Sequence, residues 1–384
     1  PVSESTIVDW SEDLLRKFRK RVRANGVQWL TGECKYLSPY LLPVPLVEIQ
    51  SSAVRALQAQ GFATVARLPL KSAALRGHVL HHMGQLSSST VLFLDKVSSL
   101  TLRVLGEKEH TFERSSSELA GTFAGTQVTI HDSANGSRQY AVWSRELHVA
   151  SASPEFRAAV SALPGRWPEI EDISVSIAVR LGDVPEPGRF SIYLPTLVAT
   201  GSAVHVNAPF FGDMSRTSIS FEDAYNHQLL QTAGDLAVEV VRERLAGKGQ
   251  AEARAIIDVI SPLGNDQAAS SRWTQLMNES AERSKASLDD EPLVLAEAGW
   301  RPLNMTSLVP DTSKTSFLTE DLLRKYATFD IFHSCLSSRQ RQLKALAIAR
   351  YPEIGAYPLE SDVAATVAAI AVDLHSNGGD WNAF

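Results

Sequence analysis

A hairpin signal in the first half of the chain constrains the fold more than any other feature. Asn135-Gly136 stands between two segments rich in β-forming residues, 126–131 and 139–147. Asn and Gly tolerate the positive φ angles of the tight turns that join antiparallel strands. A third segment of the same kind, 110–114, precedes these two. We therefore predict an antiparallel meander across residues 108–148.

Helical and strand patterns surround this meander. We predict further strands over 63–70, 91–94, 99–105, 173–181, 189–194 and 203–207 from their β-branched and apolar character. Apolar residues at helical spacing predict helices over 11–25, 51–60, 71–85, 154–162, 222–247, 249–259, 268–286, 318–327, 336–350 and 360–375. The expected fold class is mixed α/β (α+β), with mixed or antiparallel sheets, packed helices and a helix-rich C-terminal part.

The length of 384 residues exceeds the usual size of one hydrophobic core, so we expect more than one domain. Residues 1–75 are expected to hold an N-terminal helix and a possible tail end of a further domain. Residues 76–250 are expected to form an α/β domain, and residues 251–384 a mostly helical one.

Composition excludes several functional classes. The net charge of −6 provides no overall attraction to nucleic acid or to an anionic membrane. No apolar run reaches the ~20 residues that span a bilayer, and no secretory signal opens the chain. Cys34 and Cys335 are the only cysteines, and two distant thiols do not make a disulfide framework, which favours a reducing compartment. Cytoplasm is the expected location. The chain opens on Pro1 without Met, so we expect a processed chain or a fragment.

Three motifs with possible chemistry do not match their full patterns. The loop from Gly121 to Gly125 lacks the lysine of a phosphate-binding loop and is interpreted as a turn. His78 and His82 are four residues apart on one helix, but a third metal ligand is not evident. The basic helix at 16–23 is interpreted as a solvated face, with contact to nucleic acid as the alternative. We therefore predict no catalytic residue, no metal site and no cofactor within this chain.

The most informative stretch runs from residue 188 to residue 236. It combines a strand, a turn at Pro195 and a second strand on which His205 and Asn207 face the same side. Two interpretations of this polar face stay open. It lines an interdomain cleft, or its side chains form hydrogen bonds buried within the fold. A glycine-containing loop ending at Arg216 follows, and Asn226 lies one turn into the next helix, where a structural hydrogen bond is expected.

This stretch resembles the sacsin family, whose members are ATPases of the heat-shock-chaperone (GHKL) type. Seven clusters occur in the family's order over about 40 residues: Gly188-Arg189-Phe190, Tyr193-Leu194-Pro195, Thr200-Gly201, His205-Val206-Asn207, Phe210-Phe211, Ser215-Arg216 and Tyr225-Asn226. More loosely, 64–70 resembles the last strand of the family's ATP-binding domain, and 91–94 with 100–104 resembles the two strands beyond it. The family's Asp-x-Gly-x-Gly nucleotide loop does not occur anywhere in the sequence.

The resemblance implies a chaperone-like or nucleotide-responsive interaction module that transduces the state of an adjacent ATP-binding domain. Arg216, with Gly212 and Ser215, would sense the nucleotide, unless Arg216 pairs with a structural acid such as Asp213 or Glu222. His205, Asn207 and Asn226 would form the polar face toward the partner. ATP and Mg²⁺ are expected only together with that other domain, and so is ATPase activity. The alternative is a component of a bacterial defence or nucleic-acid-processing system.

Overall fold

The computed structural model describes residues 56–57, 59–61, 72–104, 106, 108–119, 125–164, 167–212, 217–245, 249–263, 267–285, 287–288, 290–302, 320–327, 330–350 and 360–376. The chain divides into two compact units, Pro1–Gly77 and His78–Phe384. The predictions for helix 11–25 and strand 63–70 lie outside the described residues. The elements that follow belong to the second unit, apart from the start of helix α3 (Ala73–Gly84).

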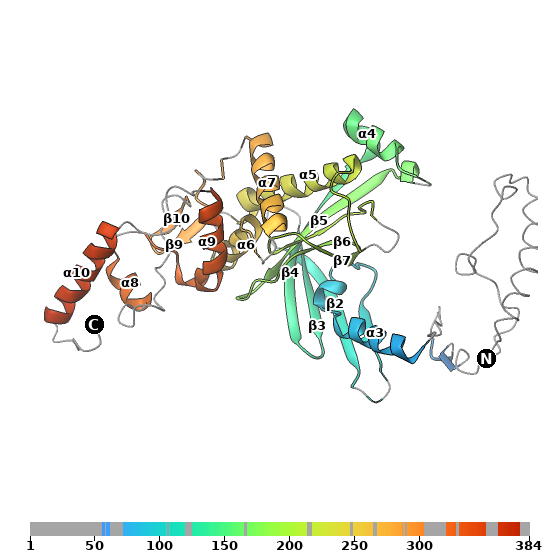
Figure 1. Cartoon of the computed structure of the whole chain (residues 1–384), viewed down its shortest axis with the longest axis horizontal. Helices are drawn as coiled ribbons and strands as arrows, with labels where there is room; N and C mark the ends of the chain where they lie inside the picture. The colour runs from blue at the N-terminus through green and yellow to red at the C-terminus, as the bar shows by residue number, and fades with distance from the viewer. Residues whose placement is uncertain are drawn as a thin grey trace, which may run out of the picture. The chain divides into compact units, whose positions relative to one another are not determined.

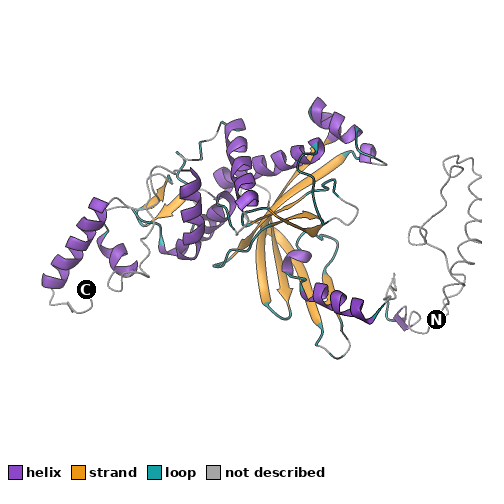
Figure 2. Cartoon of the chain, in the orientation of Figure 1, coloured by secondary structure: helices purple, strands orange, loops and turns teal. Residues whose placement is uncertain are grey.

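The fold is mixed α/β and is built on one eight-stranded sheet of order β1-β2-β3-β4-β5-β8-β6-β7 (Figures 1 and 2). Neighbouring strands are antiparallel except for the parallel pair β6 and β8. The strands are β1 (Ser99–Leu102), β2 (His110–Leu119), β3 (Gly125–Asp132), β4 (Gly136–His148), β5 (Asp172–Leu181), β6 (Arg189–Ile192), β7 (Leu194–Ala199) and β8 (Val204–Asn207).

The predicted meander is confirmed as strands β2 to β4, and the separate strand prediction at 99–105 is confirmed as β1. The Asn-Gly turn of the meander joins β3 to β4, where Asp132 pairs with Gly136 and Gly136 has a φ of +81°. The Asp132 carboxylate accepts hydrogen bonds from the backbone N–H groups of Ala134 and Asn135, at 2.9 and 3.1 Å. Burial alone would raise the pKa of Asp132, but the bonds from Asn135, Ala134 and His110 outweigh it and lower that pKa to about 2. An ionised side chain therefore holds the turn.

Helices cover one face of the sheet and a short irregular segment covers the other. Helices α5 (Ala224–Glu239) and α6 (Gln250–Ile260) pack on the first face, and α4 (Pro154–Ser161) and α7 (Gln267–Arg283) pack against α5. Their apolar residues share one core with β5, whose middle residues are buried on both sides of the sheet. A near-continuous apolar strand is typical of a sheet covered on both faces. This core continues through α6 and α7.

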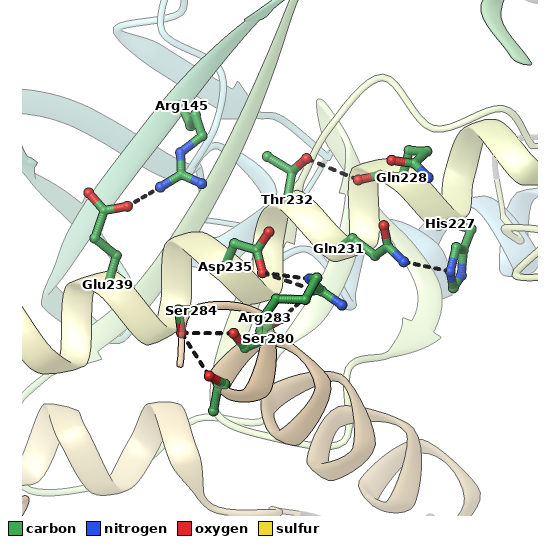
Figure 3. A network of polar contacts seen from close by, with 11 residues as sticks. Arg145, His227, Gln228, Gln231, Thr232, Asp235, Glu239, Ser280, Arg283 and Ser284 are labelled. Atoms are coloured by element: carbon green, nitrogen blue, oxygen red, sulfur yellow. Dashed lines mark hydrogen bonds and ion pairs between the residues drawn. The ribbon is translucent and has the colours of Figure 1, made fainter. Parts of the chain in front are cut away.

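Polar contacts join α5 to its neighbours (Figure 3). Arg283 of α7 donates to Asp235 of α5 at 2.8 Å, and Arg145 of β4 pairs with Glu239 at the end of the same helix. Gly234 allows the close approach of α7, because a Cβ there would lie 2.4 Å from the Ser280 hydroxyl. After α5 the chain continues as a π-helical turn, Val240–Leu245.

Two predictions for the sheet and the segments beside it, at residues 91–94 and at Pro195, are wrong. Residues 91–94 are not a strand but follow the 3₁₀ turn Ser88–Thr90 as further turns, and the buried Val91 and Leu92 pack on the second face of the sheet. A short apolar run has the same pattern in a buried turn as in a strand. The predicted turn at Pro195 is also wrong, because Pro195 lies within strand β7 and pairs with Ser191 of β6. An edge strand tolerates proline because one side of its backbone needs no ladder partner.

The C-terminal part is helix-rich, as predicted. Its helices are α8 (Glu320–Tyr326), α9 (Gln340–Arg350, after a 3₁₀ turn at Ser334–Arg339) and α10 (Glu360–Ser376). A small hairpin, β9 (Val294–Ala296) and β10 (Gly299–Arg301), was not predicted. Arg339, fully buried, pairs with Asp258 of α6 at 2.9 Å and donates to the Gly182 carbonyl at 2.8 Å. The ion pair thus ties the 3₁₀ turn before α9 to helix α6, and the hydrogen bond ties it to the loop after β5.

Candidate functional site

Strand β8 carries two of the predicted site residues near the centre of the sheet. It lies between β5 and β6, with His205 opposite Ala178 and Asn207 opposite Ser176. Both side chains therefore point to the same face, as their alternate spacing predicts. His205 is 1% exposed and Asn207 is 7% exposed. The Asn207 side chain accepts a hydrogen bond within the fold, and the His205 ring packs against another ring of the fold.

Asn207 holds the turn between β6 and β7. Its Oδ1 atom accepts a hydrogen bond of 2.8 Å from the backbone N–H of Tyr193. Tyr193 has a φ of +65°, a left-handed conformation that is costly for a bulky side chain and persists only where its surroundings enforce it. The Tyr193 side chain is 53% exposed. A buried amide thus presents an aromatic ring at the surface.

His205 is a neutral imidazole at neutral pH. Burial lowers the pKa of His205 to about 4, although the nearby Glu186 acts in the opposite direction. The distance from Nε2 of His205 to Oε1 of Glu186 is 3.8 Å, which is too long for a hydrogen bond. Among the described residues, Nε2 has no hydrogen-bond partner. The ring instead meets the Tyr140 ring edge to face, with centroids 6.0 Å apart.

Glu186 collects the polar groups around His205. Its Oε2 atom accepts from the Tyr140 hydroxyl at 3.0 Å and from Arg138 at 3.2 Å, and lies 3.8 Å from Arg180. Burial, followed by the charge of Glu186, raises the pKa of Tyr140 far above its ordinary value. Sequence patterns did not indicate Glu186, because it lies in the loop between β5 and β6, where no periodicity applies. Its partners come from β4, β5 and β8.

Gly212 marks the start of the predicted nucleotide-sensing loop. Its backbone forms an isolated bridge with Ile219, and a Cβ at this position would lie 2.5 Å from the Ser218 carbonyl oxygen. The carbonyl of Thr217 accepts a hydrogen bond from the backbone N–H of Leu197 at 3.1 Å. Ser215 and Arg216 lie outside the described residues. Both ends of the segment that carries them are therefore attached to the fold.

Asn226 fastens this loop to helix α5. Its Oδ1 accepts from the backbone N–H of Phe211 at 2.8 Å, and its Nδ2 donates to the carbonyls of Phe211 and Ser220 at 2.6 and 2.8 Å. Asn226 is itself fully buried at the start of α5, where the Asp223 side chain caps the helix by accepting from the N–H groups of Tyr225 and Asn226. The expected structural hydrogen bond is present.

Two glycines of the resemblance occupy positions without room for a side chain. A Cβ on Gly188 would lie 1.9 Å from the Val204 carbonyl oxygen. Gly201 has a φ of +84°, and a Cβ there would lie 2.2 Å from the backbone of Ala269 in α7. Glycine is required where backbones approach this closely. Gly188 thus brings the start of β6 against β8, and Gly201 brings the loop between β7 and β8 against α7.

The residues that the structure describes include no group of three or more possible metal ligands. His78, His81 and His82 are exposed on α3, and His81 bonds to Gln85 at 2.9 Å. None of the described helices is long and apolar enough to cross a bilayer. Comparisons with protein-family models, curated proteins and solved structures find no match to this chain.

Proposed function

We propose that this chain is a nucleotide-responsive, chaperone-like interaction module that transduces the state of an adjacent GHKL-type ATP-binding domain. The proposal starts from the ordered sequence clusters between residues 188 and 226. In this role the chain's Arg216 reaches the nucleotide of the adjacent domain, with Gly212 and Ser215 shaping its loop. ATP and Mg²⁺ belong to that domain.

The single observation that carries the proposal is the fixed base of the loop around Arg216. Asn226 binds the backbone on both sides of this loop, at Phe211 and Ser220, and Gly212 pairs with Ile219. An arginine on a loop with a fixed base loses less conformational freedom when it meets a phosphate. Its planar guanidinium also matches phosphate oxygens in a two-point contact.

The test is Arg216→Ala in a protein that joins this chain to an ATP-binding domain. A nucleotide-sensing arginine acts mainly as charge develops on the transferring phosphoryl group, so its loss should lower turnover more than nucleotide affinity. The expected loss in turnover is about 30- to 1,000-fold. Arg157→Ala is the matched control, because the Arg157 side chain donates to the local carbonyls of Ala150 and Ala152, far from the Arg216 segment in sequence.

Thermal unfolding of the same variants separates a sensing role from a structural one. A structural Arg216 would lower the melting temperature and reduce affinity and turnover together. Normal turnover in a normally folded Arg216→Ala protein would remove Arg216 from the mechanism. The alternative role in a defence or nucleic-acid-processing system stays a prediction, because the basic segment 16–23 lies outside the described residues.

A further inference from the structure

A cavity of about 240 Å³ opens between helices α5 and α7. Its floor is apolar and consists of Phe190 of β6, Leu230 of α5 and Trp273 of α7. These three side chains are buried, and the Trp273 indole N–H already donates to the Val259 carbonyl at 2.8 Å. The floor therefore offers a ligand aromatic and aliphatic contact without an unsatisfied polar group.

One wall of the cavity carries a positive charge that lies against an aromatic ring. The guanidinium of Arg272 lies over the ring of Phe221, 3.8 Å from the ring centroid. Stacking uses the flat face of the guanidinium and leaves the N–H groups at its edge free to donate. In the described part of the chain, no carboxylate forms an ion pair with Arg272. A ligand carboxylate would therefore meet an available donor pair there.

The other end of the same wall carries a negative charge. Arg272, Gln275 and Glu279 all line the cavity, because residues three to four positions apart share a face of a helix. Gln275 donates to the Glu279 carboxylate at 2.8 Å, which orients that group. Arg272 and Glu279 are seven residues apart, which places their backbones about 10 Å apart along the helix axis. The wall thus has a cationic end and an anionic end.

The charge balance of the rim disfavours a simple anion. Glu222 also lines the cavity, so the one arginine and two glutamates of the rim give a formal charge of −1. A carboxylate would meet Arg272 and an ammonium group would meet Glu279, so a ligand with both charges contacts more of this rim than a simple cation does. The volume of about 240 Å³ is below the usual range for drug-sized ligands, so the cavity suits a small ligand.

We infer that this cavity binds a small zwitterion with an apolar body, of the size of a dipeptide. Its carboxylate contacts Arg272, its ammonium group contacts Glu279, and its apolar side chain lies on Phe190, Leu230 and Trp273. The inference does not depend on the proposed function, since each of these residues belongs to this chain and none senses a nucleotide.

The probe is the dipeptide Ala-Phe with both termini free, titrated into the whole chain by calorimetry. We expect a dissociation constant of about 0.1–1 mM. Arg272→Gln and the C-terminal amide of the dipeptide should each weaken binding about 10- to 100-fold, the usual effect of losing a charge-assisted bond. When the Arg272→Gln variant is tested with the amide, the loss of affinity should be no greater than for either change alone, because both changes remove the same contact. Glu279→Gln and N-terminal acetylation of the dipeptide should behave as a second such pair.

Matched controls lie on the same helix outside the cavity. Arg283→Gln removes a charge that pairs with Asp235, and Glu282→Gln removes an exposed carboxylate. Both variants should bind Ala-Phe as the unchanged chain does, and the thermal melting of all four variants checks their folding. Absence of binding at about 10 mM Ala-Phe would overturn the inference. The inference would also be overturned if the C-terminal amide of Ala-Phe bound as tightly as the free acid. The same holds for a folded Arg272→Gln variant with unchanged affinity.

Discussion

The Asn226 side chain holds the backbone of Phe211 through two hydrogen bonds of opposite direction. Its amide oxygen accepts from the Phe211 N–H at 2.8 Å, while its amide nitrogen donates to the Phe211 carbonyl at 2.6 Å. A third bond reaches the Ser220 carbonyl at 2.8 Å. Only a primary amide has an acceptor and two donors in this arrangement, so asparagine or glutamine alone could make all three bonds.

Asn226→Ala should lower the free energy of unfolding by about 2–4 kcal/mol, because it leaves buried backbone groups without partners. Urea denaturation measures this loss. Gln231→Ala on the same helix is the control, since Gln231 bonds only to the exposed His227 among the described residues, and it should change stability by less than about 0.5 kcal/mol. Equal losses from the two substitutions would contradict a special role for Asn226.

His205 should make the fold sensitive to mild acid. Its pKa is about 4 in the folded protein, whereas an unfolded histidine titrates near ~6.5. The unfolded chain therefore takes up the proton first. The stability from this residue is complete above about pH 6.5 and is lost as the pH falls toward about 4. The loss at about pH 4.5 should amount to about 2–3 kcal/mol.

Unfolding free energies of the unchanged chain and His205→Gln, measured from about pH 7.5 to about pH 4.5, test this. The variant should show a flatter profile. His148→Gln removes an exposed histidine that pairs with Asp172, and exposed pairs contribute little, so its profile should follow that of the unchanged chain. Parallel profiles for all three proteins would show that His205 is not the acid-sensitive group.

Gly201→Ala should destabilise the fold far more than Gly136→Ala. Both glycines have positive φ, at +84° and +81°, but only Gly201 faces another backbone, that of Ala269. The conformational cost is common to both substitutions, at about 1–2 kcal/mol. At Gly201 a steric cost of at least about 1–3 kcal/mol adds to it. Melting temperatures of the two variants check this, and similar shifts would mean that α7 does not pack on Gly201 as described.

The buried ion pair of Asp258 and Arg339 should show strong coupling. Arg339→Met leaves a buried carboxylate uncompensated and should cost about 3–5 kcal/mol. Asp258→Asn combined with Arg339→Met should cost less than the sum of the single changes, by about 1–3 kcal/mol. A double-mutant cycle by urea denaturation measures this coupling. Arg283→Met, which removes a half-exposed pair with Asp235, should cost less than about 1 kcal/mol.

Local sequence signals were sufficient for much of the fold. The Asn-Gly turn, the alternation in β2 to β4 and the apolar spacing of α5 each depend on neighbours along the chain, and the structure has these elements close to the predicted residues. The same holds for His205 and Asn207, whose shared face follows from the alternation of a strand. Ambiguous local patterns gave wrong predictions at two places: residues 91–94 form turns and not a strand, and Pro195 lies in a strand and not in a turn.

Tertiary structure alone decided which polar groups meet. Glu186 lies in a loop without periodicity, and Arg339 lies among polar residues that are usually exposed. Their partners are distant in the chain: Tyr140 and His205 for Glu186, and Asp258 for Arg339. The cavity beside Arg272 likewise requires β6, α5 and α7 to come together. Sequence patterns report the side of an element that is buried. They do not report which distant side chain is buried against it, because that depends on how the whole sheet and its helices pack.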